Sequence, residues 1–103
     1  MDNIEDLSSG VHPFEEVRRS MISQGQVIDG SSIKQSDLYL FLTKNEINNF
    51  WDAESTSDDI EMLKSICDIT WLFASYALSR GWDVKEAYEE AIRIRNTTHR
   101  QGI

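Results

Sequence analysis

The chain has 103 residues, of which 40% are hydrophobic and 27% charged, proportions that are ordinary for one globular domain. Its formal net charge of −8 argues against a general DNA- or RNA-binding protein, because phosphate contacts need a basic surface. No apolar run approaches membrane-spanning length, and the start Met-Asp-Asn-Ile-Glu-Asp lacks the basic residues of a signal peptide. We therefore expect a cytoplasmic protein that binds neither nucleic acid nor membrane.

The N-terminal part is predicted to be a flexible arm followed by one helical domain. Residues 1–10 are polar and end in Ser-Ser-Gly, which is typical of a loose terminus, so the domain is expected to cover residues 11–103. Pro13 is suited to the first position of a helix, and Gly25 is suited to its end.

Two longer helices are predicted next. The sequence from Gly25 to Ser36 contains Gly and Ser and is interpreted as a loop, and Ser36 or Asp37 is expected to cap a helix over Leu38–Ala53. Ser57 is expected to cap a third helix, Ile60–Arg80, because acidic residues follow it at the positive end of the helix dipole.

The third helix is apolar around most of its circumference, which predicts burial on several sides. Its main face holds Ile60, Leu63, Cys67, Trp71, Ala74 and Leu78, and Cys67, the single cysteine, is expected to be a buried structural thiol. In so short a chain, such a helix favours a bundle that a second subunit completes.

A fourth helix is predicted from the capping-box spacing of Asp83 and Glu86, although Asp replaces the usual Ser or Thr. Its expected buried stripe is Val84, Ala87, Tyr88, Ala91 and Ile94. No segment alternates with period two, so the fold is predicted to be all-α: a compact four-helix bundle, completed as a homodimer or tetramer.

The candidate site combines polar pairs from the second and third helices. Glu46 and Asn49 lie three residues apart, as do Ser65 and Asp68, so each pair projects from one face of its helix. Four facing carboxylates would hold a hard cation such as Mg²⁺. Here each pair retains one carboxylate. An alternative for Asp68 is a structural salt bridge, for example with Lys44 or Lys64.

The order of several segments resembles the MazG-like nucleoside triphosphate pyrophosphohydrolases, an all-α superfamily. The segments that carry the resemblance are Met21-Ile-Ser-Gln-Gly-Gln-Val27, Leu42-Thr-Lys-Asn-Glu-Ile-Asn-Asn49, Ser65-Ile-Cys-Asp68 with Trp71, Gly81-Trp-Asp83 with Ala87 and Glu90, and Asn96-Thr-Thr-His-Arg100. Together they span most of the chain.

This resemblance implies a chemistry in which Mg²⁺ or Mn²⁺ binds a nucleoside triphosphate and water cleaves between the α and β phosphates. Carried over by position, Glu46 and Asp68 match catalytic metal ligands, while Asn49 and Ser65 stand where the family has carboxylates. Asn can ligate through its carbonyl and Ser through its hydroxyl. Both are neutral, however, so cation binding and hydrolysis are expected to be weakened.

Four further residues are candidates for nucleotide binding. Asn96, His99 and Arg100 stand near the terminal Asn-x-x-Lys element of the family and would contact phosphate, with His99 or Arg100 replacing the Lys. Trp51 follows Phe50 and is the best candidate for stacking on a base, although a core or interface role is favoured for the tryptophans.

Two functional hypotheses follow. The first is a nucleotide pyrophosphohydrolase with reduced activity. The second is a catalytically inactive pseudoenzyme whose acidic surface binds a basic protein partner as a regulator or inhibitor. The acidic residues concerned are Asp52, Glu54, Asp58, Asp59 and Glu61. The small size and divergence would suit a phage-encoded protein.

Overall fold

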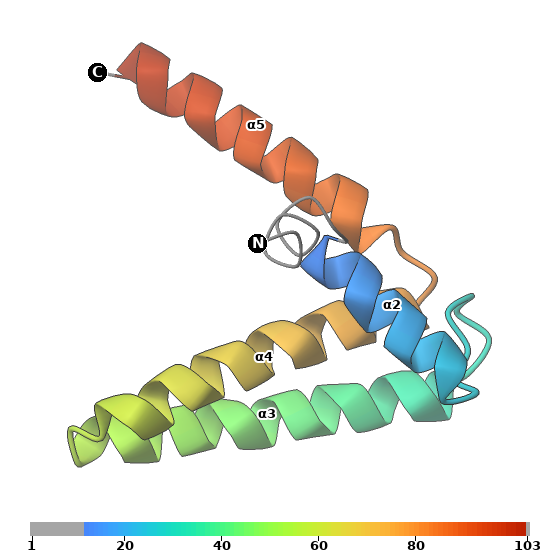
Figure 1. Cartoon of the computed structure of the whole chain (residues 1–103), viewed down its shortest axis with the longest axis horizontal. Helices are drawn as coiled ribbons and strands as arrows, with labels where there is room; N and C mark the ends of the chain where they lie inside the picture. The colour runs from blue at the N-terminus through green and yellow to red at the C-terminus, as the bar shows by residue number, and fades with distance from the viewer. Residues whose placement is uncertain (1–11, 103) are drawn as a thin grey trace, which may run out of the picture.

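The computed structural model describes residues 12–102, and its side chains as far as residue 97. The described residues form helices and turns without a strand, so the predicted all-α fold is confirmed. The helices are α2 (Pro13–Ser23), α3 (Ile33–Ser55), α4 (Asp59–Ser79) and α5 (Val84–Gly102) (Figure 1). Within the described part, no helix is long and apolar enough to span a bilayer. The predicted N-terminal arm lies outside the described residues.

The predicted beginning of α2 is confirmed, and that of α3 is wrong. Pro13 is the first residue of α2, and Nδ1 of His12 accepts a hydrogen bond from the backbone nitrogen of Phe14 at 3.0 Å. Helix α3 begins at Ile33 instead of Leu38, because Ser32 is its cap and accepts from the nitrogen of Gln35 at 3.1 Å. The Ser-rich sequence predicted to be loop as far as Ser36 therefore contains the cap and the first turn of a helix.

The turns around α4 follow the sequence pattern with one shift. Asp58 caps α4 in place of the predicted Ser57, and its Oδ1 accepts from the nitrogen of Glu61 at 3.1 Å. Ser57 instead makes the turn between α3 and α4, with a positive φ of 57°. The predicted cap of α5 is confirmed, because Oδ1 of Asp83 accepts from the nitrogen of Glu86 at 3.0 Å.

Helices α3 and α4 form a long antiparallel hairpin, seen along the lower part of Figure 1. Apart from Leu78, the buried residues of the two helices are small: Ser36, Thr43 and Ala53 on α3, and Ser65, Ala74, Ser75, Ala77 and Ser79 on α4. Small side chains let two helix backbones approach closely, and buried hydroxyls need partners. In the described residues, every buried side-chain nitrogen and oxygen has a hydrogen-bond partner.

The base of the hairpin is held by a polar network. The side chain of Gln35 donates to the carbonyl of Val27 at 2.7 Å and accepts from the nitrogen of the same residue at 3.1 Å. It also donates to the hydroxyl of Ser79 at 2.8 Å, which lies 2.9 Å from the hydroxyl of Ser36. The network joins the loop before α3 to the last turn of α4.

Two glycines let this loop touch the end of α4. The nitrogen of Gly30 donates to the carbonyl of Ser79 at 3.0 Å. Gly30 and Gly81 both have φ of 81°, and a Cβ on Gly30 would lie 2.8 Å from the carbonyl oxygen of Arg80. The approach therefore requires glycine for both conformation and space.

The apolar core is small and lies where α2 crosses the end of α4. Its buried members are Val17 and Met21 from α2 and Ala74 and Leu78 from α4. Partly buried apolar residues packed against them are Phe14, Ile28, Tyr39 and Val84.

Helix α5 diverges from the hairpin, so that α5 and the hairpin form the two arms of a V with α2 near the vertex (Figure 1). The radius of gyration is 16.2 Å, against about 13 Å for a compact domain of this length. Within one chain, the stripe predicted to be buried on α5 is only half-buried at Val84 and exposed beyond it.

Most of the predicted buried face of α4 is also exposed in the single chain. Ala74 and Leu78 are buried as predicted, whereas Ile60, Leu63 and Trp71 are exposed. The prediction of a buried thiol is wrong for the single chain, because Cys67 is exposed. The physical reason is that the short helix α2 covers only the last part of α4.

Candidate functional site

The hairpin brings Glu46, Asn49 and Ser65 into direct contact. The hydroxyl of Ser65 donates to Oε1 of Glu46 at 3.0 Å, and the side-chain nitrogen of Asn49 donates to Oε2 at 3.2 Å. Ser65 is buried and Glu46 is half-buried. The two residues that stand where the resemblance implies carboxylates therefore donate hydrogen bonds to the remaining carboxylate.

Asp68 forms an ion pair within α4, as the alternative interpretation of the sequence predicted. The ammonium of Lys64 lies 3.1 Å from Oδ2 of Asp68, one helical turn away. The hydrogen bond to Asp68 raises the pKa of Lys64, and the negative charges of Asp68, Glu46 and Glu61 act in the same direction. Both side chains of the pair are partly exposed, so water screens the attraction.

Two shallow depressions flank Glu46 on the hairpin. One, of about 270 Å³, is lined by Leu42, Asn45, Glu46, Asp68, Trp71 and Leu72. The other, of about 380 Å³, lies toward the tip of the hairpin and is lined by Glu46, Asn49, Asp52, Ala53, Thr56, Asp58, Glu61, Lys64 and Ser65. The first is mostly apolar around its two carboxylates, and the second is acidic.

This donor set does not fit a hard divalent cation well. Mg²⁺ prefers several carboxylate oxygens that are free to coordinate it. Among the described residues, no group of three or more His, Cys, Asp or Glu side chains is placed to hold a metal ion. Both oxygens of Glu46 already accept hydrogen bonds, and Asp68 already faces an ammonium group. The arrangement is a self-satisfied polar cluster.

The nucleotide-binding candidates are not assembled around Glu46 in one chain. Trp51 is exposed, packs edge-on against Phe50 at 5.4 Å and lines neither depression. Asn96 is exposed on α5, which points away from the hairpin (Figure 1). The side chains of His99 and Arg100 lie outside the described residues.

Trp71 is the aromatic residue beside the candidate carboxylates. It lines the same depression as Glu46 and Asp68. The residue predicted to stack on a nucleobase is Trp51, because it follows another aromatic residue near the end of a helix. The better signal is spacing: Trp71 follows Asp68 by three residues, which places both on one face of α4.

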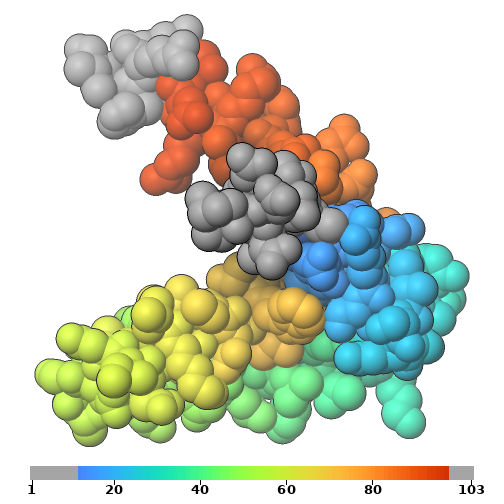
Figure 2. All heavy atoms as spheres, in the orientation of Figure 1, coloured from blue at the N-terminus to red at the C-terminus, as the bar shows by residue number. Residues whose placement is uncertain are grey.

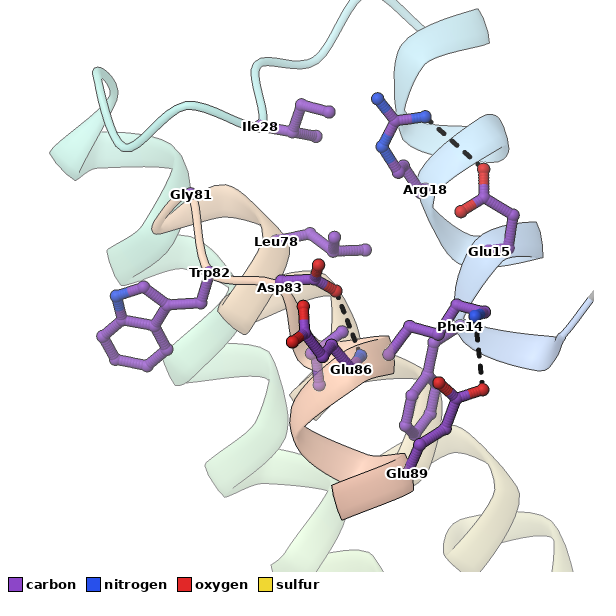
Figure 3. A pocket seen from close by; sticks show the side chains of 12 residues that line it. Phe14, Glu15, Arg18, Ile28, Leu78, Gly81, Trp82, Asp83, Glu86 and Glu89 are labelled. Atoms are coloured by element: carbon purple, nitrogen blue, oxygen red, sulfur yellow. Dashed lines mark hydrogen bonds and ion pairs between the residues drawn. The ribbon is translucent and has the colours of Figure 1, made fainter. Parts of the chain in front are cut away.

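Another depression lies away from this site, between α2, the end of α4 and the start of α5. Its volume is about 590 Å³, and Figure 3 shows Glu15 and Arg18 on one side facing Asp83, Glu86 and Glu89 on the other. Its charges largely pair among themselves, since Arg18 contacts Glu15 at 3.4 Å and Lys85 contacts Glu89 at 3.2 Å. Asp83 is occupied in capping α5.

Comparison of the chain with protein-family models, with curated proteins and with solved structures gives no match.

Proposed function

We propose that this protein is a pseudoenzyme: a helical protein related in plan to the MazG-like pyrophosphohydrolases that no longer hydrolyses nucleotides and instead binds a basic protein partner. One observation carries the proposal. The carboxylate of Glu46, which would have to coordinate a cation, accepts hydrogen bonds from both Ser65 and Asn49.

The hydrogen-bond donors Ser65 and Asn49 compete with a metal ion for the same lone pairs on the Glu46 carboxylate. A carboxylate that accepts two hydrogen bonds, one from a buried hydroxyl, has to lose them before it can bind a metal. Lys64 places a positive charge beside Asp68 and repels a second cation. The site has thus replaced metal coordination by internal donors.

The acidic tip of the hairpin supports the binding role. Asp52, Asp58 and Glu61 line the depression toward the tip, and the residues around the α3–α4 turn are exposed. A surface of this charge attracts the lysines and arginines of a basic protein, and it does so most strongly at low ionic strength.

Residual pyrophosphohydrolase activity is the second candidate, and a specific observation favours it. Glu46 and Asp68 line one depression together with Trp71 and Leu42. The carboxylates match the implied ligands, and the apolar wall would suit a nucleobase. This function requires the cluster around Glu46 to open when nucleotide and cation bind.

A charge-restoration experiment separates the two functions. The variant N49E/S65E supplies the carboxylates that the resemblance implies, and N49Q/S65T is the neutral control. Calorimetric titration with Mn²⁺ and assays of pyrophosphate release from nucleoside triphosphates are run on both variants, on wild type and on D68A.

For a pseudoenzyme, we expect no release from wild type and at least tenfold tighter Mn²⁺ binding only in N49E/S65E. Release by wild type that D68A abolishes would contradict the proposal and establish the hydrolase. If wild type already binds Mn²⁺ as tightly as N49E/S65E, the argument from occupied lone pairs fails.

A further inference from the structure

The apolar face of α4 is buried over only half of its length. At the C-terminal end, Ala74 and Leu78 pack under Val17 and Met21 of α2. Toward the N-terminal end the same face continues with Leu63, which is 62% exposed, and with Ile60, Ile66, Cys67 and Trp71, which are also exposed. In the view of Figure 2, neither α2 nor α5 overlies the part of α4 nearest its turn with α3.

The length of α2 explains the gap. At 1.5 Å per residue, its 11 residues reach about 17 Å, whereas the 21 residues of α4 reach about 32 Å. A groove of about 420 Å³ lies between the N-terminal turns of α2 and the middle of α4, and its lining is almost entirely apolar: Pro13, Phe14, Glu16, Val17, Ile66, Cys67, Thr70 and Trp71. Among the described residues, the N-terminal half of the apolar face of α4 is therefore exposed.

Helix α5 has the opposite deficiency, because most of its apolar stripe is exposed among the described residues. Only its first turns pack, with the ring of Tyr88 edge-on to that of Phe14 at 5.1 Å. From Glu89 to Thr97 every side chain is exposed. A helix of 19 residues that packs so little is only marginally stable in water, so this helix needs a partner.

The partner cannot readily be the α4 of the same chain. Phe14 lies between the first turns of α5 and the core, where it contacts Tyr88 and packs with Val84 against α2 and α4. This contact directs α5 away from the uncovered half of α4, as Figure 1 shows. A second copy of the chain is not constrained in this way.

Length, charge and area all fit α5 of a second copy. Residues 91–102 would reach about 18 Å as a helix, and they contain three arginines and no acidic residue. The hairpin, residues 33–79, contains eight acidic and three basic residues. The two surfaces are therefore complementary in charge.

The exposed apolar area is sufficient for a stable dimer. The large side chains concerned are Ile60, Leu63, Ile66, Trp71 and Phe73 on α4, and Ile92 and Ile94 on α5. At roughly 100 Å² each they amount to about 700 Å² per copy, close to the area of about 800 Å² that a standard protein interface buries on each side.

We propose that two copies of this chain exchange their α5 helices, so that the distal half of each α5 lies along the uncovered half of the partner's α4. Each copy both gives and receives a helix, so the assembly closes as a twofold dimer with no surface left to propagate. The exchange covers the apolar groove beside Cys67 and brings the basic end of α5 to the acidic hairpin. The proposal is independent of whether the site hydrolyses nucleotides.

Cys67 provides a direct test because it is the only cysteine and lies in the groove. Wild type and the variant C67S/A91C, whose cysteine lies on the α5 stripe, carry different tags. The two are mixed under conditions that let dimers exchange subunits, and the mixture is then oxidised. The control is C67S/E90C, in which the cysteine lies about 100° further round the helix. We expect a disulfide between the two tagged chains in the first mixture, at least tenfold more abundant than in the control.

The oligomeric state in solution and the disulfides of a two-cysteine variant test the proposal further. Light scattering should give a dimer for wild type, with I66D and I94D each weakening association by tenfold or more. R95E should weaken it less, and most at low salt. The variant A91C, which retains Cys67 and so carries both cysteines, should form disulfides between two chains and not within one chain. A wild-type monomer at high concentration, or a disulfide only within one A91C chain, would overturn the proposal.

Discussion

The α3–α4 hairpin and α5 solve the problem of helix stability in opposite ways. The hairpin buries small side chains, among them Ser36, Thr43 and Ser75, and satisfies each hydroxyl inside the chain. Helix α5 buries almost nothing and exposes the apolar stripe that its sequence provides. The comparison shows that hydrophobic patterning and burial within one chain are separate properties: the hairpin packs through small and polar side chains, whereas the amphipathic helix α5 leaves most of its apolar stripe exposed among the described residues.

The largest expected effect is at the base of the hairpin. Gly30→Ala should lower the free energy of unfolding by about 2–4 kcal/mol, because it adds a Cβ 2.8 Å from a carbonyl oxygen at a positive φ. Gly25→Ala is the control: its φ is 77° with nothing within 4 Å, so only the conformational cost of about 1–2 kcal/mol applies. Urea unfolding at fixed protein concentration measures both. Equal losses would show that the close approach contributes nothing.

The polar network comes next. Ser79→Ala should cost about 1–3 kcal/mol, because it removes a partner from the half-buried side chain of Gln35 and the buried side chain of Ser36. Ser55→Ala is the control, since its exposed hydroxyl bonds only to the carbonyl of Asp52. The same urea titration distinguishes them. A Ser79 variant as stable as wild type would mean that water replaces the hydroxyl and that the hairpin base is less closed than described.

A smaller effect is expected at alkaline pH. Burial raises the pKa of Tyr39, although its hydrogen bond to Gln26 acts the other way. Above the ordinary tyrosine pKa of about 10, the unfolded chain therefore loses this proton first, and stability falls as the pH rises through the raised value. Tyr39→Phe should make that fall shallower. Unfolding measured between neutral and strongly alkaline pH tests the sign, and parallel curves for wild type and Tyr39→Phe would refute it.

The smallest effect belongs to α5. The hydrogen bond from Arg93, 2.9 Å long, lowers the pKa of Glu90. The ion pair therefore supports the helix above the ordinary glutamate pKa and is lost as the pH falls through the lowered value. Glu90→Gln should remove this acid-dependent part of the helicity, measured by circular dichroism. If Glu90→Gln lowered the free energy of unfolding as much as Gly30→Ala, the distinction between the two regions would be contradicted.

The sequence predicted the helices well where local chemistry decides them. Pro13 marks the start of α2, Asp83 caps α5, and Gly81 follows the end of α4 with a positive φ. The start of α3 was predicted five residues late, because Ser32 is as typical of a loop as of a cap. Which serine accepts the hydrogen bond depends on Gln35, whose side chain is anchored by residues far away in the chain.

The candidate site could be predicted in membership but not in chemistry. Spacing alone placed Glu46 and Asp68 on facing helices, and the structure brings both to one depression. Spacing could not show that Ser65 and Asn49 would donate to Glu46, because that depends on the separation of α3 and α4 and on rotamers. Burial could not be predicted for a similar reason: the apolar pattern of α4 indicates a face suited to burial, but within the described residues this face is exposed at Cys67.

The crossing of Gly30 and Gly81 has a consequence for how the hairpin opens. It fastens the end of the hairpin where α3 begins and α4 finishes, and the opposite end is joined only by the short turn around Ser57. Amide hydrogens should therefore exchange with solvent in a gradient, fastest beside that turn and slowest near Ser79. The two helices are therefore held together most firmly at the end where Gly30 and Gly81 meet. A ligand that separates α3 from α4 would meet the least resistance at the opposite, acidic end, beside the turn around Ser57.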